Sequence, residues 1–347
     1  MKIAFIYAKG RGQRYSETVH GCAATEFFYG AVELEKRGHI VTYLELGHGG
    51  ITKLWHKFAE QLYRWRMTPT RTGGVILAEL HEMCPALNKQ DVIVATTTAA
   101  AFGLATLKML GLVKRPVIAI HCGIVNYQLA WLRRNLNAIA LKNMWTQLFG
   151  DGELQEVYRF YSVPDSRIEV NQFGVDTNFW TPSDSEGDYV LAVGNDERRD
   201  YELLVQAAEG IQGNFKIVTR RQIHSDVPPN VKVIRGNWHE QAFTDEGLRE
   251  LYQKAKMVVI PLKNSPQPSG QSVCLQAMSC GKAVILTQTE GLWSHEMMRD
   301  GENVIFVPPS DKDALRESIK QLSLDTERRN NIGERARETA CSEGNIS

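Results

Sequence analysis

The chain has little cysteine, no excess of either charge and no long apolar run. Its six cysteines include no C-x-x-C pair, which argues against a structural zinc site and a disulfide framework. Basic and acidic residues both number 40, so no net positive charge favours nucleic acid as a partner. No apolar stretch approaches the roughly 20 residues that span a bilayer, and MKIAFIYAKG lacks the features of a signal peptide. These absences predict a reduced, cytoplasmic protein without a metal.

The 347 residues exceed the usual size of one hydrophobic core, so we expect two domains. Short apolar runs alternate with amphipathic stretches, which is typical of buried parallel strands joined by helical crossovers. In the first half, strands are expected at residues 2–8, 39–46, 91–97, 115–121 and 167–174, with helices at 25–36, 104–112 and 154–161. In the second half, strands are expected at residues 189–194, 215–219, 231–236, 257–262, 282–287 and 303–309.

A linker is predicted near the middle of the chain. Proline and a Ser/Asp/Gly cluster follow Trp180, and a new strand begins at about Tyr189. We therefore predict two α/β domains, residues 1–180 and 181–347, each with a doubly wound parallel sheet. Because ligands of such sheets bind beyond the carboxyl ends of the strands, the expected site is a cleft between the domains.

The run SGQSVCLQAMSCGKAV places small polar residues where a helix is expected to begin. Ser269 is predicted to cap the helix, and Gly270 lets another group approach the backbone closely. The first-turn amides of Gly270, Gln271 and Ser272 have no partners inside the helix, so they predict a phosphate site. Gln276 follows on roughly the same face and can bond hydroxyls of a bound group. An ordinary capped core helix is the alternative, and spacing alone leaves both open.

Several motifs in the same order resemble the large family of retaining glycosyltransferases with the GT-B fold. PSGQSVCLQAMSCGKAVILTQTEGLW and RDGENVIFVPPSDKDALRESI resemble its donor-binding segment. Upstream, RIEVNQFGVDTNFWTP, VLAVGNDERRDYELLVQAA and LRELYQKAKMVVIPL resemble three further passages. The resemblance is strong in the last half of the chain and covers the first half in outline. The residues that match the donor-segment pattern are Ala277, Met278, Gly281, Val284, Asp300, Gly301, Asn303, Val307 and Pro308.

This resemblance implies two Rossmann-like domains, an N-terminal one for the acceptor and a C-terminal one for a nucleotide-sugar donor. It implies transfer with retention, without a metal or other cofactor, to a glycan, a lipid-linked acceptor or a small molecule. Many members carry two glutamates eight positions apart, where this chain has Pro268 and Gln276. By the resemblance, Gln276 contacts the ribose. Because Pro268 cannot replace the lost carboxylate, we expect the amides and hydroxyls of residues 269–272 to hold the sugar instead.

The resemblance also assigns the groups that meet the leaving diphosphate. Arg199 matches the family's basic residue after the first strand of the second domain, and Gly194, Asn195 and Arg198 share its loop. Asn195 stands where many members have another arginine, and Lys263 is a strand-end cation that can compensate. Apart from Arg199, a solvated surface charge is the favoured alternative for each cation.

In the first domain, the resemblance points to a histidine and a glycine-containing loop. His121 ends an expected strand and is predicted to be catalytic beside the donor phosphates, with a structural histidine as the alternative. The loop AKGRGQRYSETVHG, with Gly10, Gly12 and Arg14, resembles a loop that contacts phosphates and acceptor. A surface loop is the alternative.

The stretch ITKLWHKFAEQLYRWRMTPTR sets aromatic residues among cations. Such a helix suits an anionic membrane face, so peripheral contact with the inner membrane surface is one expectation. A helix packed on the first sheet is the favoured alternative. Two rival functions stay open, a non-catalytic sugar-nucleotide-binding GT-B protein and a GT-B sugar-nucleotide epimerase. Relatives often continue beyond ARETACSEGNIS, so a truncated C-terminus is a further expectation.

Overall fold

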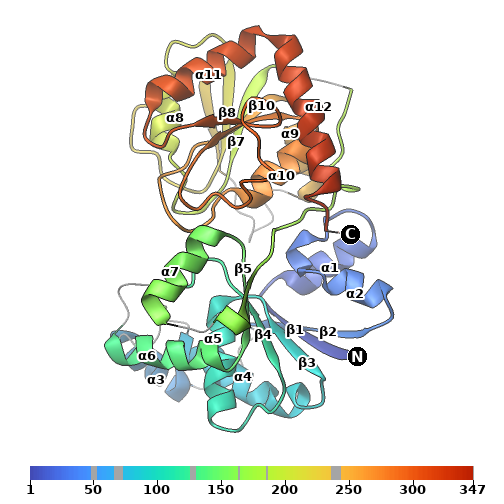
Figure 1. The fold of residues 1–347 in the computed structure, drawn as a ribbon, viewed down its shortest axis with the longest axis vertical. Coiled ribbons are helices and arrows are strands. Elements are labelled where there is room, and N and C mark those ends of the chain that lie inside the picture. Colours follow the sequence, from blue (N-terminus) through green and yellow to red (C-terminus); the bar gives the residue numbers. More distant parts are fainter. Residues whose placement is uncertain are drawn as a thin grey trace. The chain divides into compact units, whose positions relative to one another are not determined.

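The computed structural model describes residues 1–47, 53–65, 73–125, 130–162, 165–184, 187–235 and 244–346. The chain divides into two compact units, each with its own parallel sheet (Figure 1). Residues 1–16 and 28–171 form the N-terminal unit, and residues 17–27 and 172–347 form the C-terminal unit. The segment 17–27 therefore groups with a unit that is distant from it in sequence. The division after residue 180 stays a prediction.

The N-terminal unit has a six-stranded parallel sheet in the order β2-β1-β3-β4-β5-β6. Its central strands are buried on both faces, as their continuous apolar sequences predict. The predicted strands are present, but β5 was missed because its sequence WTQL is half polar and Trp145 is 46% exposed. The strands are β1 (Lys2–Ala8), β2 (Ile40–Leu46), β3 (Val92–Ala95), β4 (Val117–Ile120), β5 (Trp145–Leu148) and β6 (Ile168–Val170).

Of the three helices expected in the first half, two overlap observed helices and one does not form as a single helix. The single helix expected over residues 25–36 is wrong, because Tyr29 (φ 53°) and Gly30 (φ 83°) adopt left-handed conformations that interrupt it. The elements are α1 (Arg11–Val19), η1 (Glu26–Phe28), α2 (Ala31–Lys36), α3 (Lys53–Arg64), α4 (Gly73–Leu87), α5 (Thr98–Met109), α6 (Trp131–Lys142), α7 (Asp151–Tyr161) and η2 (Asp165–Arg167).

The C-terminal unit has a second six-stranded parallel sheet, in the order β12-β11-β10-β7-β8-β9. All six strands lie where the apolar runs predict them. They are β7 (Tyr189–Val193), β8 (Asn214–Val218), β9 (Val231–Ile234), β10 (Ala255–Ile260), β11 (Ala283–Thr287) and β12 (Ile305–Val307). The predicted class, α/β with two doubly wound parallel sheets, is confirmed.

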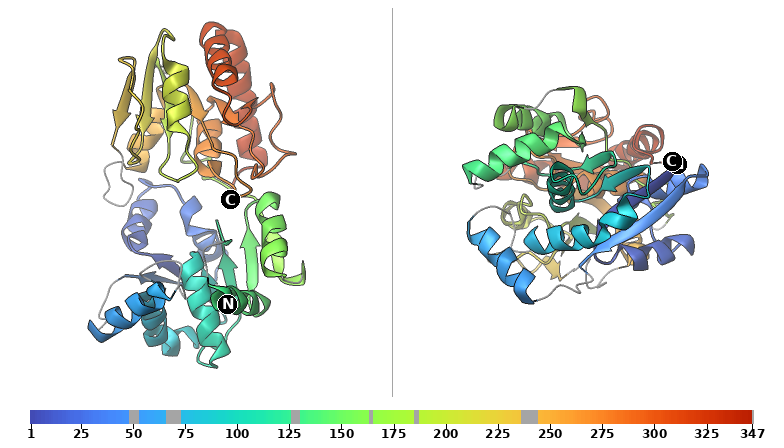
Figure 2. Two further views of the ribbon diagram at one scale, coloured as in Figure 1. Left: turned by 90° about the vertical axis from the view of Figure 1, so that its left-hand side faces the viewer. Right: turned by 90° about the horizontal axis from the view of Figure 1, so that it is seen from below.

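Within the described residues, five helices flank the second sheet (Figure 2). Helices α8 and α11 pack together, while α10 packs on α12 and on strand β11. Side chains at the N-cap positions start four of them, since Asp200, Thr244, Asp311 and Asp325 accept backbone N–H groups of α8, α9, α11 and α12. The helices are α8 (Tyr201–Ala208), α9 (Asp245–Gln253), α10 (Gln271–Ser279), α11 (Lys312–Leu324) and α12 (Thr326–Ser342).

The order of strands in the second sheet marks its ligand-binding edge. The chain builds outward from β7 through β8 to β9, then returns to place β10 on the other side of β7. Ligands of doubly wound sheets bind at such a switch point, beyond the carboxyl ends of the strands on either side. We therefore expect a ligand site in the loops that follow β7 and β10.

The predicted membrane-facing stretch is only partly described. No helix in the described part of the chain has both the length and the apolar character needed to cross a membrane. Within α3, Phe58 is 46% and Tyr63 38% exposed, and Trp65, just after the helix, is 59% exposed. The side chains of residues 51–56 and all of residues 66–71 lie outside the described residues. Membrane contact stays a prediction.

Candidate functional site

The loop after β7 begins at a glycine that lets a cation pack against the backbone. Gly194 has φ 145°, and a Cβ atom placed there would lie 2.3 Å from Nε of Arg199. The hydroxyl of Tyr201 donates to the carbonyl oxygen of Gly194 at 2.9 Å, which holds the turn. Any larger residue at position 194 would expel the guanidinium group.

Arg199 is a buried cation between the two strand-end loops. Its side chain is 3% exposed, and its Nε lies 2.7 Å from Oδ2 of Asp196. Its main chain forms an antiparallel bridge with Leu262, just after β10. On the far side, its Nη1 lies 3.2 Å from the position of a Cβ atom on Gly270. Arg199 therefore places a positive charge directly behind the start of α10.

Asp196 completes this arrangement and was missed by the sequence analysis. Partial burial by itself would raise the pKa of its carboxyl group. The charge of Arg199 and hydrogen bonds from the Ser269 hydroxyl and backbone amides outweigh that effect and keep the pKa below its usual value. Ser269 Oγ donates to Asp196 Oδ1 at 2.7 Å, which joins the two loops. The only sequence signal was a carboxylate three positions before an arginine.

Helix α10 begins one residue later than predicted. The cap residue is Gly270, with φ 83° and no side-chain cap, so the prediction that Ser269 caps the helix is wrong. Ser269 instead bonds Asp196 across the loops. The first bond of the helix runs from the N–H of Cys274 to the carbonyl oxygen of Gly270 at 2.9 Å. The N–H groups before it have no acceptor within the helix, and they form the positive end of its dipole.

Replacing Gly270 with alanine is expected to cost about 3 kcal/mol of the unfolding free energy of the C-terminal unit. A left-handed conformation costs an L-residue about 1 kcal/mol, and the new Cβ atom would lie 2.8 Å from Cγ2 of Ile260. Urea unfolding of Gly301→Ala is the control, since Gly301 has φ 73° and open space around it. Equal losses in the two variants would show that close packing at Gly270 is unimportant.

The remaining predicted donor residues lie in the same two loops. Asn195 holds the turn, because its Oδ1 accepts the Arg220 N–H at 2.7 Å. Arg198 is half-buried and bonds the side chain of Gln267. Lys263 is exposed, and its N–H donates to the carbonyl oxygen of Arg198 at 2.8 Å. Their contact with a donor stays a prediction.

Gln276 lies deeper along α10 and is bonded within the protein at both ends of its amide. The side chain belongs to a residue that is only 3% exposed. Its Oε1 accepts the Tyr252 hydroxyl at 3.1 Å, and its Nε2 donates to Oε1 of Glu26 at 2.9 Å. The assignment of Gln276 to a donor ribose stays a prediction. The buried Glu26 had no sequence signal, since it lies 250 positions away.

His121 follows β4 in the N-terminal unit and is fully buried. Its Nδ1 lies 3.2 Å from Oγ1 of Thr98, and burial lowers its pKa to about 3. The turn after it is held by Glu153, whose Oε1 accepts the N–H groups of Gly123 and Ile124 at 2.7 and 2.8 Å. His121 is thus a neutral interior residue in this structure, and its catalytic role stays a prediction.

The predicted phosphate loop after β1 is a helix. Residues 11–19 form α1, so Gly12 and Arg14 lie inside a helix and the expectation of a loop is wrong there. The N–H groups of Gly10 and Gly12 both donate to the carboxylate of Glu45 on β2. A carboxylate at the amino end of a helix is favourable, which explains why the helix starts here. Glu45 thus accepts the N–H groups of this segment within the N-terminal unit, and the contact of Gly10, Gly12 and Arg14 with phosphates or acceptor stays a prediction.

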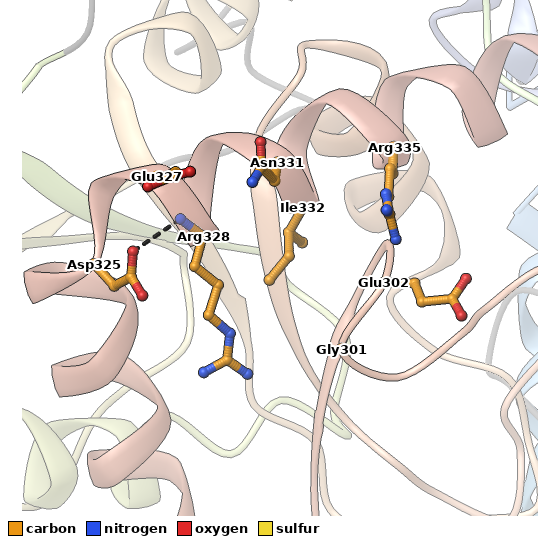
Figure 3. Close-up of a pocket in the computed structure, with 8 residues that line it drawn as sticks. All are labelled: Gly301, Glu302, Asp325, Glu327, Arg328, Asn331, Ile332 and Arg335. Atoms are coloured by element: carbon orange, nitrogen blue, oxygen red, sulfur yellow. Dashed lines mark hydrogen bonds between the residues drawn. The ribbon is translucent and has the colours of Figure 1, made fainter.

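A separate hollow of about 320 Å³ lies beside α12 in the C-terminal unit (Figure 3). Its lining mixes both charges, and Asp325 is engaged in capping the helix through the N–H of Arg328. The lining includes none of the predicted site residues. It consists of Gly301, Glu302, Asp325, Glu327, Arg328, Asn331, Ile332 and Arg335.

Comparison with known proteins classifies the C-terminal half. Residues 181–339 match the family described as "Glycosyl transferases group 1". The matched segment holds β7, the loop of Arg199, β10 and all of α10. The resemblance to group 1 glycosyltransferases that the motifs predicted is therefore confirmed.

Individual relatives are distant in sequence and similar in fold. Over 160 residues the chain is 26% identical to an uncharacterized glycosyltransferase of Methanocaldococcus jannaschii, MJ1178, and the match spans 44% of each protein. The structure of Anabaena HepE in complex with UDP-glucose has a TM-score of 0.70 at 15% identity, covering 100% of this chain and 96% of HepE. Sucrose-phosphate synthase from Thermosynechococcus elongatus has a TM-score of 0.68 at 17% identity, covering 99% and 95%. The predicted GT-B fold is confirmed.

Proposed function

We propose that this protein is a glycosyltransferase that moves a sugar from a nucleotide-sugar donor to an acceptor with retention and without a metal. The C-terminal unit binds the donor, and the N-terminal unit binds a glycan, a lipid-linked acceptor or a small molecule. The group 1 family match supports glycosyl transfer. The complex of Anabaena HepE with UDP-glucose supports a nucleotide sugar as donor for this fold.

The observation that carries the proposal is the buried cation behind the start of α10. Arg199 is held against Gly194 and Gly270 at the switch point of the second sheet. A nucleoside diphosphate leaves with growing negative charge, so a fixed cation and oriented N–H groups stabilise the transition state. Both act on the same place, because the helix dipole and Arg199 each contribute positive potential at the amino end of α10.

Calorimetric titration with UDP, GDP, ADP and their glucose conjugates tests this proposal. We expect micromolar binding of at least one diphosphate, slow hydrolysis of its sugar conjugate, and activity that survives EDTA. The anomeric configuration of the product, followed by NMR, tests retention. Binding without hydrolysis or transfer would favour the non-catalytic alternative. Conversion of the sugar without an acceptor would favour the epimerase.

We also propose that the protein works in the cytoplasm and contacts membranes peripherally through α3. Exposed Phe58 and Trp65 lie beside Lys57 and Arg64, which suits an anionic surface. We expect co-sedimentation with vesicles containing phosphatidylglycerol to fall several-fold in Phe58→Ser/Trp65→Ser. Vesicles of phosphatidylcholine alone are the control. Equal sedimentation of both proteins would leave α3 as an ordinary surface helix.

A further inference from the structure

A buried carboxylate contacts α10 from a segment that is remote in sequence. Glu26 is 1% exposed and lies in residues 17–27, which group with the C-terminal unit. Its Oε1 accepts two N–H groups, from Nε1 of Trp180 and from Nε2 of Gln276, each at 2.9 Å. Its Oε2 accepts the N–H of Asp176 at 3.3 Å. One side chain thus joins the linker before β7 to the middle of α10.

The segment that carries Glu26 has further contacts of its own. The N–H of Ala24 donates to Oδ2 of Asp245 on α9 at 3.1 Å, and Thr25 Oγ1 donates to Oδ2 of Asp176 at 3.0 Å. The ring of Phe27 packs on that of Phe173, with centroids 5.8 Å apart. These contacts hold the backbone on both sides of Glu26, so its carboxylate has a defined position.

We propose that Glu26 is a positioning residue for α10. By fixing the amide of Gln276, it orients the helix whose amino end forms the donor site. The expected effect of Glu26 on donor binding rests on the proposed function. Its effect on the position of α10 concerns only the fold of the C-terminal unit and does not depend on that function.

The direction of the hydrogen bond between Glu26 and residue 276 limits which side chains can occupy position 276. Because Glu26 Oε1 accepts from both Trp180 and Gln276, position 276 must supply a donor. Glutamine does so and still accepts the Tyr252 hydroxyl through Oε1. A glutamate at 276 would set two carboxylates within hydrogen-bond distance in a buried place, where both cannot ionise. This geometry explains a glutamine rather than a glutamate at this position of α10.

The electrostatics of Glu26 supply a pH signature. Burial raises its pKa from 4.5 to about 7, although the N–H donors oppose the rise and the carboxylate of Asp245 adds to it. The other ionisable groups facing it are Asp176 in the linker and Tyr252 on α9. Between pH 4.5 and 7 the folded state binds more protons than the unfolded state. Stability therefore falls as pH rises through this window.

Three variants separate positioning from bulk stability. Glu26→Gln keeps an acceptor at Oε1 for Trp180 and Gln276, gives up only the longer 3.3 Å bond from the Asp176 N–H, and cannot titrate. It should therefore retain the position of α10 and lose the pH signature. Glu26→Ala leaves two buried donors unpaired. Gln276→Glu places acceptor against acceptor and should lower the melting temperature at pH 8 by about 10 °C, and by less at pH 5. Gln321→Glu is the matched control, since Gln321 donates to Glu317 at 3.0 Å on an exposed face of α11.

Two cysteines, one in α10 and one at its C-cap, report the position of the helix without any nucleotide. Cys274 and Cys280 are 0% and 1% exposed, and burial raises the pKa of each thiol to about 12. Both should be slow to react with a maleimide at pH 7, whereas the exposed Cys22, Cys122 and Cys341 react at once. Labelling is measured site by site by mass spectrometry. We expect labelling of the two buried thiols to accelerate at least tenfold in Glu26→Ala and to stay slow in Glu26→Gln.

Diphosphate affinity connects positioning to the donor site. Affinity of folded Glu26→Ala for the diphosphate that the wild type binds should fall at least tenfold, and Glu26→Gln should retain it. Unchanged thiol labelling in Glu26→Ala, or wild-type stability of Gln276→Glu at pH 8, would overturn the positioning role. Faster thiol labelling of Glu26→Ala with unchanged diphosphate affinity would show that the position of α10 does not affect donor binding. If the wild type binds no diphosphate, the proposed function fails, and the labelling still decides the positioning.

Discussion

Replacing Arg199 with methionine is expected to reduce sugar-transfer turnover about 100-fold or more. The change removes the cation behind the start of α10, and losing one preorganised electrostatic group costs about 3 kcal/mol in the transition state. Methionine has a comparable length, so the space between Gly194 and Gly270 stays largely filled. Asp196 loses its partner, but its side chain is 42% exposed and water can solvate it. The loss of unfolding free energy should therefore be only about 2 kcal/mol.

Arg198→Met is the control for this prediction. Arg198 is half-buried and bonds Gln267 at the surface of the same loop, so its loss should reduce turnover by less than tenfold. Turnover and diphosphate affinity are measured at 20 °C, where both variants are folded. Turnover of Arg199→Met within threefold of the wild type would make Arg199 a structural cation and remove the main support for the donor site.

Acid sensitivity of the N-terminal unit is expected to depend on His121. Burial holds its folded pKa at about 3, against about 6.5 when unfolded. Between these values the unfolded state binds the additional proton, so stability is complete above pH 6.5 and falls as pH decreases. From pH 7 to pH 5 the wild type should lose about 2 kcal/mol through this histidine alone. His121→Gln cannot bind that proton and should lack this component.

His81→Gln is the matched control, because His81 is exposed on α4 of the same unit. The free energy of unfolding of the wild type, His121→Gln and His81→Gln is measured by urea titration at pH 5, 6 and 7, with a probe in the N-terminal unit. Glu26 acts in the opposite direction over part of this range, so the two units must be followed separately. The same pH dependence in His121→Gln and the wild type would show that His121 is solvated, which would return it to the candidates for catalysis.

The local sequence was sufficient to predict the α/β architecture, because a strand that is buried on both faces has a recognisable apolar sequence. Strands covered on both faces read as continuous apolar runs, and all eleven expected runs contain a strand of one of the two sheets. β5 was missed because it is half polar and partly exposed, so it has no such pattern although it lies between β4 and β6. The ordered motifs of the second half also predicted the resemblance to group 1 glycosyltransferases, because their order along the chain can be read from the sequence alone.

Only the tertiary structure determined the state of the site residues. The sequence predicted that Arg199 and Gln276 belong to the donor site. It did not predict that Arg199 is buried beside Asp196, or that Gln276 bonds Glu26, which lies 250 positions away. It placed His121 at the end of a strand, but it did not predict that the side chain is fully buried. A residue's pattern of neighbours in sequence indicates its element and its face. Its hydrogen-bond partners, burial and charge depend on strand order and on which distant segments pack together, and those follow from the whole fold.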